Sequence, residues 1–211
     1  MSGMAPNLAS LLRLMLVTDD ALLSGRDLIE VARSAERGGV TAVQLRLKRA
    51  TARELVSATN ALVATLRIPV LVNDRLDAAL AGGAAGVHLG PDDMAISLAR
   101  RIAPPGFILG ASAGTADEAE AGRAADYWGV GPWSASGTKP DAGAPLGAEG
   151  FRRLVLAGRG IPCVAIGGVR PEDMGAVIAA GGAGVAVVSG ILGAPDVEAA
   201  AREYWNRVHA F

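Results

Sequence analysis

The sequence predicts an α/β fold, a single (β/α)8 barrel with a parallel eight-stranded sheet over residues 1–211. Short apolar runs alternate with longer amphipathic or alanine-rich segments along the whole chain, which is typical of parallel strands joined by helices. The runs are almost continuously apolar, as expected for strands covered on both faces. They number about eight, the count that closes such a barrel. An open, doubly wound sheet is the alternative architecture.

The predicted strands are the short apolar runs themselves. The first reads Leu-Met-Leu-Val-Thr-Asp and the last reads Gly-Val-Ala-Val-Val-Ser-Gly. Together the eight strands are predicted at residues 14–19, 42–48, 69–74, 86–90, 107–112, 126–132, 162–168 and 184–190.

The segments between the runs carry the start and stop signals of helices. Thr51 with Glu54, and Thr115 with Glu118, have the spacing of a capping box. Pro171 stands at a first helical turn, where proline is tolerated. The predicted helices cover residues 26–38, 51–67, 76–84, 94–103, 115–125, 146–158, 171–180 and 196–209.

The composition excludes several classes of function. The net charge is −1, so no general attraction to nucleic acid or to an anionic membrane is expected. No uncharged apolar run approaches the roughly 20 residues of a membrane span. The one cysteine, Cys163, cannot build a disulfide framework or a cysteine-based metal site, and its apolar run predicts a buried thiol. No signal peptide is evident at residues 1–10, so a cytoplasmic location is expected. The sequence identifies no interface, and a homodimer stays open.

Polar residues at the carboxyl ends of the strands are the candidates for a functional site, because active sites of these barrels lie there. Gln44, Arg46 and Lys48 alternate at the end of the second run and are expected to share one face. Only two lysines occur in the chain, Lys48 and Lys139. The alternative is an outward face that reaches solvent between helices. His88 lies inside an apolar run and is expected to be a hydrogen-bonded core residue.

Carboxylates follow the third and fourth runs. Asp74 with Asp92 or Asp93 could hold one Mg²⁺, which takes oxygen ligands and leaves room for phosphate oxygens. The alternative is that Asp74 and Asp92 cap the helices that follow them, and for Asp92 we favour capping.

Two further loops could bind anions. Residues 134–145 form a long irregular stretch that joins small hydroxyl residues and glycine to Lys139, and such a loop can offer backbone amides, hydroxyls and an ammonium. Gly167-Gly168 and Ser189-Gly190 follow the last two runs, where phosphate sites are common in this fold. The alternatives are a solvated turn and two ordinary glycine turns.

The predicted site has more positive charge than one monophosphate requires. Arg46, Lys48 and Lys139 are joined by a predicted metal pair and a separate glycine-lined pocket. A diphosphate with Mg²⁺, together with a second phosphorylated molecule, fits these features better. The expected chemistry is loss of pyrophosphate and capture by a nucleophile, with cations and Mg²⁺ stabilising the departing charge.

Taken together, these motifs resemble the thiamine phosphate synthase family, in order and spacing, from Leu14 to about Ala200. The stretches that carry the resemblance are residues 44–48 (QLRLK), 71–74 (LVND), 86–90 (GVHLG) with Asp93, 109–112 (LGAS), Gly131-Pro132 with 138–141 (TKPD), 166–168 (IGG) and Val188-Ser189.

The resemblance implies a site of three parts. Hydroxymethylpyrimidine diphosphate would be held by Gln44, Arg46, Lys48, Asn73, Ser112 and Lys139, of which Arg46, Lys48, Ser112 and Lys139 would act in catalysis. Mg²⁺ would be ligated by Asp74 and Asp93. Thiazole phosphate would be held by Ser136, Gly137, Thr138, Gly168, Val188 and Ser189. In this family the diphosphate ionises to a carbocation-like species that the thiazole nitrogen captures.

The chain departs from the family pattern at three positions, and two alternative functions remain. The family often has Gln at Pro91, His at Gly114 and Thr at Ser136. Thiazole tautomerases, which resemble the synthases, use a histidine after the fifth strand and do not need the diphosphate-binding cations. Gly114 and the three cations therefore favour the synthase. The other alternative is a non-catalytic binder of phosphorylated ligands on the same barrel.

Overall fold

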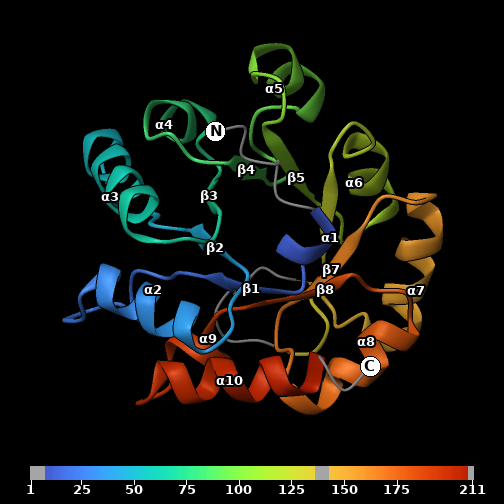
Figure 1. The fold of residues 1–211 in the computed structure, drawn as a ribbon. Helices are drawn as coiled ribbons and strands as arrows, with labels where there is room; N and C mark the ends of the chain where they lie inside the picture. The colour runs from blue at the N-terminus through green and yellow to red at the C-terminus, as the bar shows by residue number, and fades with distance from the viewer. Residues whose placement is uncertain (1–7, 136–142, 209–211) are drawn as a thin grey trace.

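A computed structural model of the chain describes residues 8–135 and 143–208. Within these residues eight strands form a closed barrel in the order β1 to β8, and all of the neighbouring pairs are parallel. The longer helices lie around the outside of the barrel (Figure 1). The predicted TIM-barrel class is confirmed, and the open sheet is wrong.

Each strand falls inside one of the predicted runs but is shorter. The strands are β1 (Leu14–Val17), β2 (Ala42–Leu45), β3 (Val70–Asn73), β4 (Gly86–Leu89), β5 (Ile108–Ser112), β6 (Tyr127–Val130), β7 (Cys163–Ile166) and β8 (Gly184–Val187).

The early end of β2 has a specific cause. Its predicted extension to residue 48 is wrong. Beyond Leu45, the Thr18 side chain, rather than the backbone of β1, forms the hydrogen bonds to the backbone of Arg46. The Arg46 amide donates to Thr18 Oγ1 at 2.8 Å, and the same hydroxyl donates to the Arg46 carbonyl at 3.1 Å. Thr18 is fully buried, so the backbone of Arg46 is held at the rim of the barrel although the strand has ended.

The predicted helices are present, with two short additions. The helices are α1 (Leu8–Leu11), α2 (Leu28–Arg37), α3 (Ala52–Thr65), α4 (Leu76–Ala81), α5 (Ile96–Ile102), α6 (Ala116–Ala121), α7 (Gly147–Gly158), α8 (Met174–Ala179), α9 (Ser189–Leu192) and α10 (Val197–Val208), and a 3-10 turn, η1 (Pro171–Asp173), precedes α8. The four-residue helices α1 and α9 were not expected. None of the described helices is long and apolar enough to cross a membrane.

Of the two predicted capping boxes, one is complete. Thr51 and Glu54 satisfy each other's backbone amides. Thr115 accepts from the Glu118 amide at 3.2 Å, but the Glu118 carboxylate accepts from the Gly114 amide at 2.6 Å. The second box is therefore only half formed, because Glu118 fixes the loop after β5.

Two apolar layers enclose the sheet. The outer layer packs between the strands and the helices and includes Cys163, which is buried as predicted. The inner layer fills the barrel and continues into Leu11 and Leu12. Thr41 Oγ1, just before β2, donates to the Leu11 carbonyl at 2.8 Å, so α1 closes the amino end of the barrel. Polar residues lie at the opposite end, where the strands finish.

Candidate functional site

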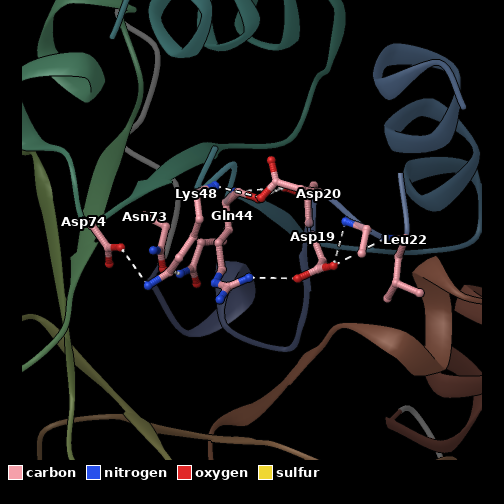
Figure 2. Close-up of polar contacts among 10 residues, drawn as sticks. Asp19, Asp20, Leu22, Gln44, Lys48, Asn73 and Asp74 are labelled. Atoms are coloured by element: carbon pink, nitrogen blue, oxygen red, sulfur yellow. Dashed lines mark hydrogen bonds and ion pairs between the residues drawn. The ribbon is translucent and has the colours of Figure 1, made fainter. Parts of the chain in front are cut away.

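The carboxyl ends of β1, β2 and β3 bring polar side chains together (Figure 2). Gln44 is buried inside the barrel, and its Nε2 donates to Asn73 Oδ1 at 2.7 Å. This bond orients both side-chain amides, because the Gln44 amide at the end of β2 and the Asn73 amide at the end of β3 hold each other in place. Gln44 therefore points into the barrel, and the alternative of an outward face is wrong for this residue.

Arg46 is fixed by a carboxylate that the sequence reasoning missed. Its Nη1 lies 2.9 Å from Asp19 Oδ2, and the two side chains are only 19% and 14% exposed. Asp19 Oδ1 accepts from the amides of Ala21 and Leu22 at 3.0 and 3.3 Å. Because Asp19 is bound at both oxygens, it holds the guanidinium in place. The ion pair is more sheltered from solvent than an ordinary surface pair.

Lys48 is held more loosely. Its Nζ lies 3.5 Å from Asp74 Oδ2, and its side chain is 54% exposed. Its backbone amide donates to Asp20 Oδ2 at 2.8 Å. The loop after β2 is thus anchored, whereas the ammonium can change partner at little cost, since exposed ion pairs contribute about 0–1 kcal/mol.

Asp74 lies in an uncommon backbone conformation. Its φ is +65°, in the left-handed region, and its amide donates to the His88 carbonyl at 2.8 Å. It does not cap α4, whose N-cap is Arg75 without a side-chain capping bond. The capping alternative is therefore wrong for Asp74, and strain of this kind is often found at functional positions.

Asp93 forms the second half of the carboxylate pair. Its Oδ2 accepts from the Gly90 amide at 2.7 Å. Burial, and then the neighbouring Asp74, raise the pKa of Asp93 to about 6, although the Gly90 bond and Lys48 act in the opposite direction. Two carboxylates that disfavour each other's charge are a suitable place for a cation.

Asp92 does not behave as predicted. It is exposed, and α5 begins at Ile96 with Ala95 as its N-cap and no side-chain capping bond. The preferred interpretation of Asp92 as a cap is therefore wrong.

The donor set fits Mg²⁺ better than a cation that needs many protein ligands. Among the residues with described positions, no group of three or more His, Cys, Asp or Glu side chains could hold a metal. Asp74 and Asp93 would supply two carboxylates, and Mg²⁺ commonly takes one or two carboxylates together with waters and phosphate oxygens.

Ser112 ends β5 at the same rim. Its Oγ lies 3.2 Å from His88 Nε2, and His88 Nδ1 lies 3.1 Å from the Tyr127 hydroxyl. His88 is buried and hydrogen-bonded, as predicted.

The ends of β7 and β8 form a separate pocket. It is small and is lined by Gly167, Gly168, Val169, Ala186, Val187, Val188, Ser189 and Gly190. Gly167 and Gly168 have φ values of +86° and +67°, and a Cβ on Gly168 would lie 2.5 Å from Ser134 Oγ. Ser134 Oγ donates to the Gly168 carbonyl at 2.6 Å. The two glycines thus serve the turn and the close packing of the chain that follows β6.

Four predicted site residues lie outside the described residues: Ser136, Gly137, Thr138 and Lys139. The structure does bring the beginning of their loop to the pocket, through the bond between Ser134 and Gly168.

The missed residues are Thr18, Asp19 and Asp20, at the end of the first strand. They follow the same rule that identified the other candidates, since polar residues at a strand's carboxyl end face the site of a barrel. The first run, Leu-Met-Leu-Val-Thr-Asp, ends with Thr18 and Asp19, so the rule identifies these two, and Asp20 is the residue that follows the run.

Comparisons with known proteins point to one family. The sequence model of a family described as thiamine monophosphate synthase matches residues 14–191. A thiamine-phosphate synthase of Moorella thermoacetica is 47% identical over 194 residues, which cover 90% of this chain and 92% of that protein. One of Azorhizobium caulinodans is 47% identical over 196 residues, with the same coverage.

A solved structure extends the likeness to three dimensions. The thiamine phosphate pyrophosphorylase of Pyrococcus furiosus superposes with a TM-score of 0.87 at 37% identity, over 97% of this chain and 98% of that one. The barrel, the matched length and the level of identity agree, and this chain belongs to the thiamine monophosphate synthase family.

Proposed function

We propose that this protein is a transferase that joins hydroxymethylpyrimidine diphosphate to thiazole phosphate, giving thiamine monophosphate and pyrophosphate. The observation that carries the proposal is the cluster at the ends of β2 to β4. There Arg46 and Lys48 stand beside the carboxylate pair Asp74 and Asp93, in a chain that is 47% identical to named synthases. We place the reaction in one catalytic domain formed by the whole chain.

The pyrimidine diphosphate would bind across β2, β3 and β5. The residues assigned to it are Gln44, Arg46, Lys48, Asn73, Ser112 and Lys139. Because Gln44 donates to Asn73, the Gln44 amide oxygen and the Asn73 amide nitrogen face away from that bond, and they can serve a donor and an acceptor on the ligand.

Mg²⁺ would be held by Asp74 and Asp93 and would supply charge for the departing pyrophosphate. Lys48 pairs with Asp74 through an exposed contact of 3.5 Å, which would cost little to break. Its exposed ammonium can then turn to the diphosphate, whereas Arg46 is already fixed by Asp19. The two cations would thus play different parts: Arg46 would orient the diphosphate from a fixed position, and Lys48 would move to contact it.

The thiazole phosphate would occupy the pocket between the ends of β7 and β8. The residues assigned to it are Ser136, Gly137, Thr138, Gly168, Val188 and Ser189. Backbone amides and hydroxyls of this kind are suited to a phosphate monoester.

The reaction needs no nucleophile from the protein. The carbon–oxygen bond to the diphosphate breaks, and the thiazole nitrogen supplies the electron pair for the new carbon–nitrogen bond. Cys163 is an unsuitable nucleophile because it lies in the outer apolar layer, where burial raises the pKa of its thiol to about 12. The protein instead contributes positioning and fixed positive charge.

An omission experiment tests the proposal. Pyrophosphate release is measured with both substrates and Mg²⁺ and with each of the three left out. We expect release only in the complete mixture. Release without the thiazole phosphate at the full rate would indicate a hydrolase, and no release by the folded protein would favour a binder of phosphorylated ligands.

The structure gives no support to a tautomerase. A Cβ at Gly114, where tautomerases use a histidine, would lie 2.8 Å from the Gly131 carbonyl oxygen, and the Gly114 amide is bound by Glu118. A side chain there would require the loop to shift.

Replacing Asp19 by asparagine is expected to lower kcat/KM for the pyrimidine diphosphate about tenfold, because a misplaced positioning group costs rate. Thr18 still holds the Arg46 backbone, so the unfolding temperature should change little. Steady-state kinetics and thermal unfolding measure both. The control is Asp117→Asn, an exposed carboxylate in the first turn of α6. Unchanged kinetics in Asp19→Asn would show that Arg46 does not need its partner.

Lys139→Ala is expected to lower turnover about a hundredfold, since an ammonium that meets the departing diphosphate stabilises the transition state. Circular dichroism should show an intact fold. A folded Lys139→Ala protein that releases pyrophosphate at a near wild-type rate would remove Lys139 from the site.

A further inference from the structure

A chain of hydrogen bonds runs from the inside of the barrel to Ser112 at its rim. The Tyr127 hydroxyl lies 3.1 Å from His88 Nδ1, and His88 Nε2 lies 3.2 Å from Ser112 Oγ. Tyr127 is 1% and His88 is 8% exposed. The three residues come from β6, β4 and β5, so the closed barrel brings them together.

Two glycines make room for these hydrogen-bonded side chains. A Cβ on Gly110 would lie 2.4 Å from the Tyr127 ring and 2.6 Å from His88 Nδ1. A Cβ on Gly129 would lie 2.9 Å from His88 Cε1 and 3.3 Å from Nε2. Since any side chain at either position would displace the imidazole or the phenol, the two neighbouring strands are shaped around the His88–Tyr127 pair.

Burial decides which atom donates in each of these two hydrogen bonds. In the part of the chain with described positions, His88 Nδ1 is the one hydrogen-bond partner of the Tyr127 hydroxyl. Burial raises the pKa of Tyr127 far above its usual range, so the phenol keeps its proton. A buried hydroxyl that donates to nothing is costly. Tyr127 therefore donates to Nδ1, and Nδ1 must be the unprotonated nitrogen.

The tautomer of His88 decides whether the Ser112 hydroxyl donates to it or accepts from it. A neutral imidazole with an unprotonated Nδ1 carries its proton on Nε2. His88 Nε2–H then donates to Ser112 Oγ, which accepts. The hydrogen of the serine hydroxyl is left to point elsewhere, and Ser112 stands half-buried at the rim where the ligand would lie.

We infer that His88 and Tyr127 are positioning residues that fix the Ser112 hydroxyl as a hydrogen-bond donor to the substrate. The substrate atom it meets is therefore an acceptor, either a ring nitrogen with a lone pair or a phosphate oxygen. The inference deepens the proposed function and rests on its placement of Ser112 against the pyrimidine diphosphate.

The tautomer of His88 can be observed without any substrate. The chain has two histidines, so ¹⁵N NMR of the histidine side chains is simple, and a His88→Gln variant assigns the signals. We expect Nε2 of His88 to resonate as a protonated, pyrrole-type nitrogen and Nδ1 as an unprotonated, pyridine-type nitrogen. The opposite assignment would overturn the inference whatever the enzyme's activity.

A double-mutant cycle tests the functional consequence. Tyr127→Phe removes only the phenol hydroxyl and frees His88 to place its proton on Nδ1, so Ser112 can donate to His88 instead of to the substrate. We expect kcat/KM to fall about threefold to tenfold, and Ser112→Ala to lower it by at least as much. If Tyr127 acts through Ser112, the double variant should be no worse than Ser112→Ala alone, within about twofold.

The chain's other tyrosine supplies a matched control. Tyr204 is also buried, and its hydroxyl donates to the Val169 carbonyl at 2.8 Å. Tyr204→Phe removes the same group, but its effect should add to that of Ser112→Ala. Additive effects of Tyr127→Phe and Ser112→Ala would overturn the inference. A Ser112→Ala protein with full activity would instead overturn the proposed placement of Ser112, while the NMR result still reports the tautomer.

Discussion

Asp93→Asn is expected to raise the Mg²⁺ concentration for half-maximal pyrophosphate release about tenfold or more, whereas Asp92→Asn changes it less than about twofold. Asp93 faces Asp74 and is one of only two carboxylates proposed for the metal, so its loss removes half of the protein's ligand charge. Asp92 is exposed. A Mg²⁺ titration of the wild-type protein and of both variants makes the measurement.

The stability of the two variants distinguishes a lost ligand from a damaged fold. Asp93→Asn removes a partly buried charge next to Asp74, and an asparagine oxygen can still accept from the Gly90 amide. The unfolding temperature without Mg²⁺ should therefore stay the same or rise. If Asp92→Asn weakens the Mg²⁺ response more than Asp93→Asn does, the metal ligand is Asp92.

Arg46→Ala is expected to lower kcat/KM for the pyrimidine diphosphate by about a hundredfold to a thousandfold, the usual effect of removing a fixed group that stabilises developing negative charge. The size of the effect follows from the sheltered pair with Asp19, which holds the guanidinium before the substrate arrives. Arg46→Lys should recover only part of the rate, because an ammonium cannot bind Asp19 and a diphosphate in the same planar geometry.

The neighbouring Arg49 provides the control for Arg46. It is exposed and lies three residues along the same loop, so Arg49→Ala changes the net charge equally but should leave kcat/KM within about twofold. Equal losses in the two variants would mean that long-range charge, rather than a contact of Arg46, supports the reaction.

The barrel could be predicted from the sequence because the signals for each strand and helix lie within that segment of the chain. Each strand is buried on both faces, so each reads as a continuous apolar run, and the glycine, proline and Thr51–Glu54 signals mark the helices between them. Gln44, Asn73 and Ser112 are candidates because they lie at or next to the carboxyl ends of their strands. The contacts of Arg46 with Thr18 and Asp19 were not foreseen, because these two residues follow β1 and lie 28 and 27 residues earlier in the chain.

The remaining differences depend on the register of the strands and on where the helices begin. His88 was expected to be hydrogen-bonded, but its link to Ser112 and Tyr127 depends on the register of β4, β5 and β6, which aligns His88 with Gly110 and Gly110 with Tyr127. Asp74 and Asp92 precede helices and so resemble caps, yet the helices begin at Leu76 and Ile96 without them. The roles assigned to the site residues all stay predictions, and Ser136, Gly137, Thr138 and Lys139 in addition lie outside the described residues.

The most direct test of the central claim is the ratio of products in the complete reaction. Thiamine monophosphate and pyrophosphate are quantified together after incubation with hydroxymethylpyrimidine diphosphate, thiazole phosphate and Mg²⁺. The proposed transfer predicts equal amounts of the two, since each new carbon–nitrogen bond releases one pyrophosphate. Pyrophosphate without thiamine monophosphate, or neither product from the folded protein, would contradict it.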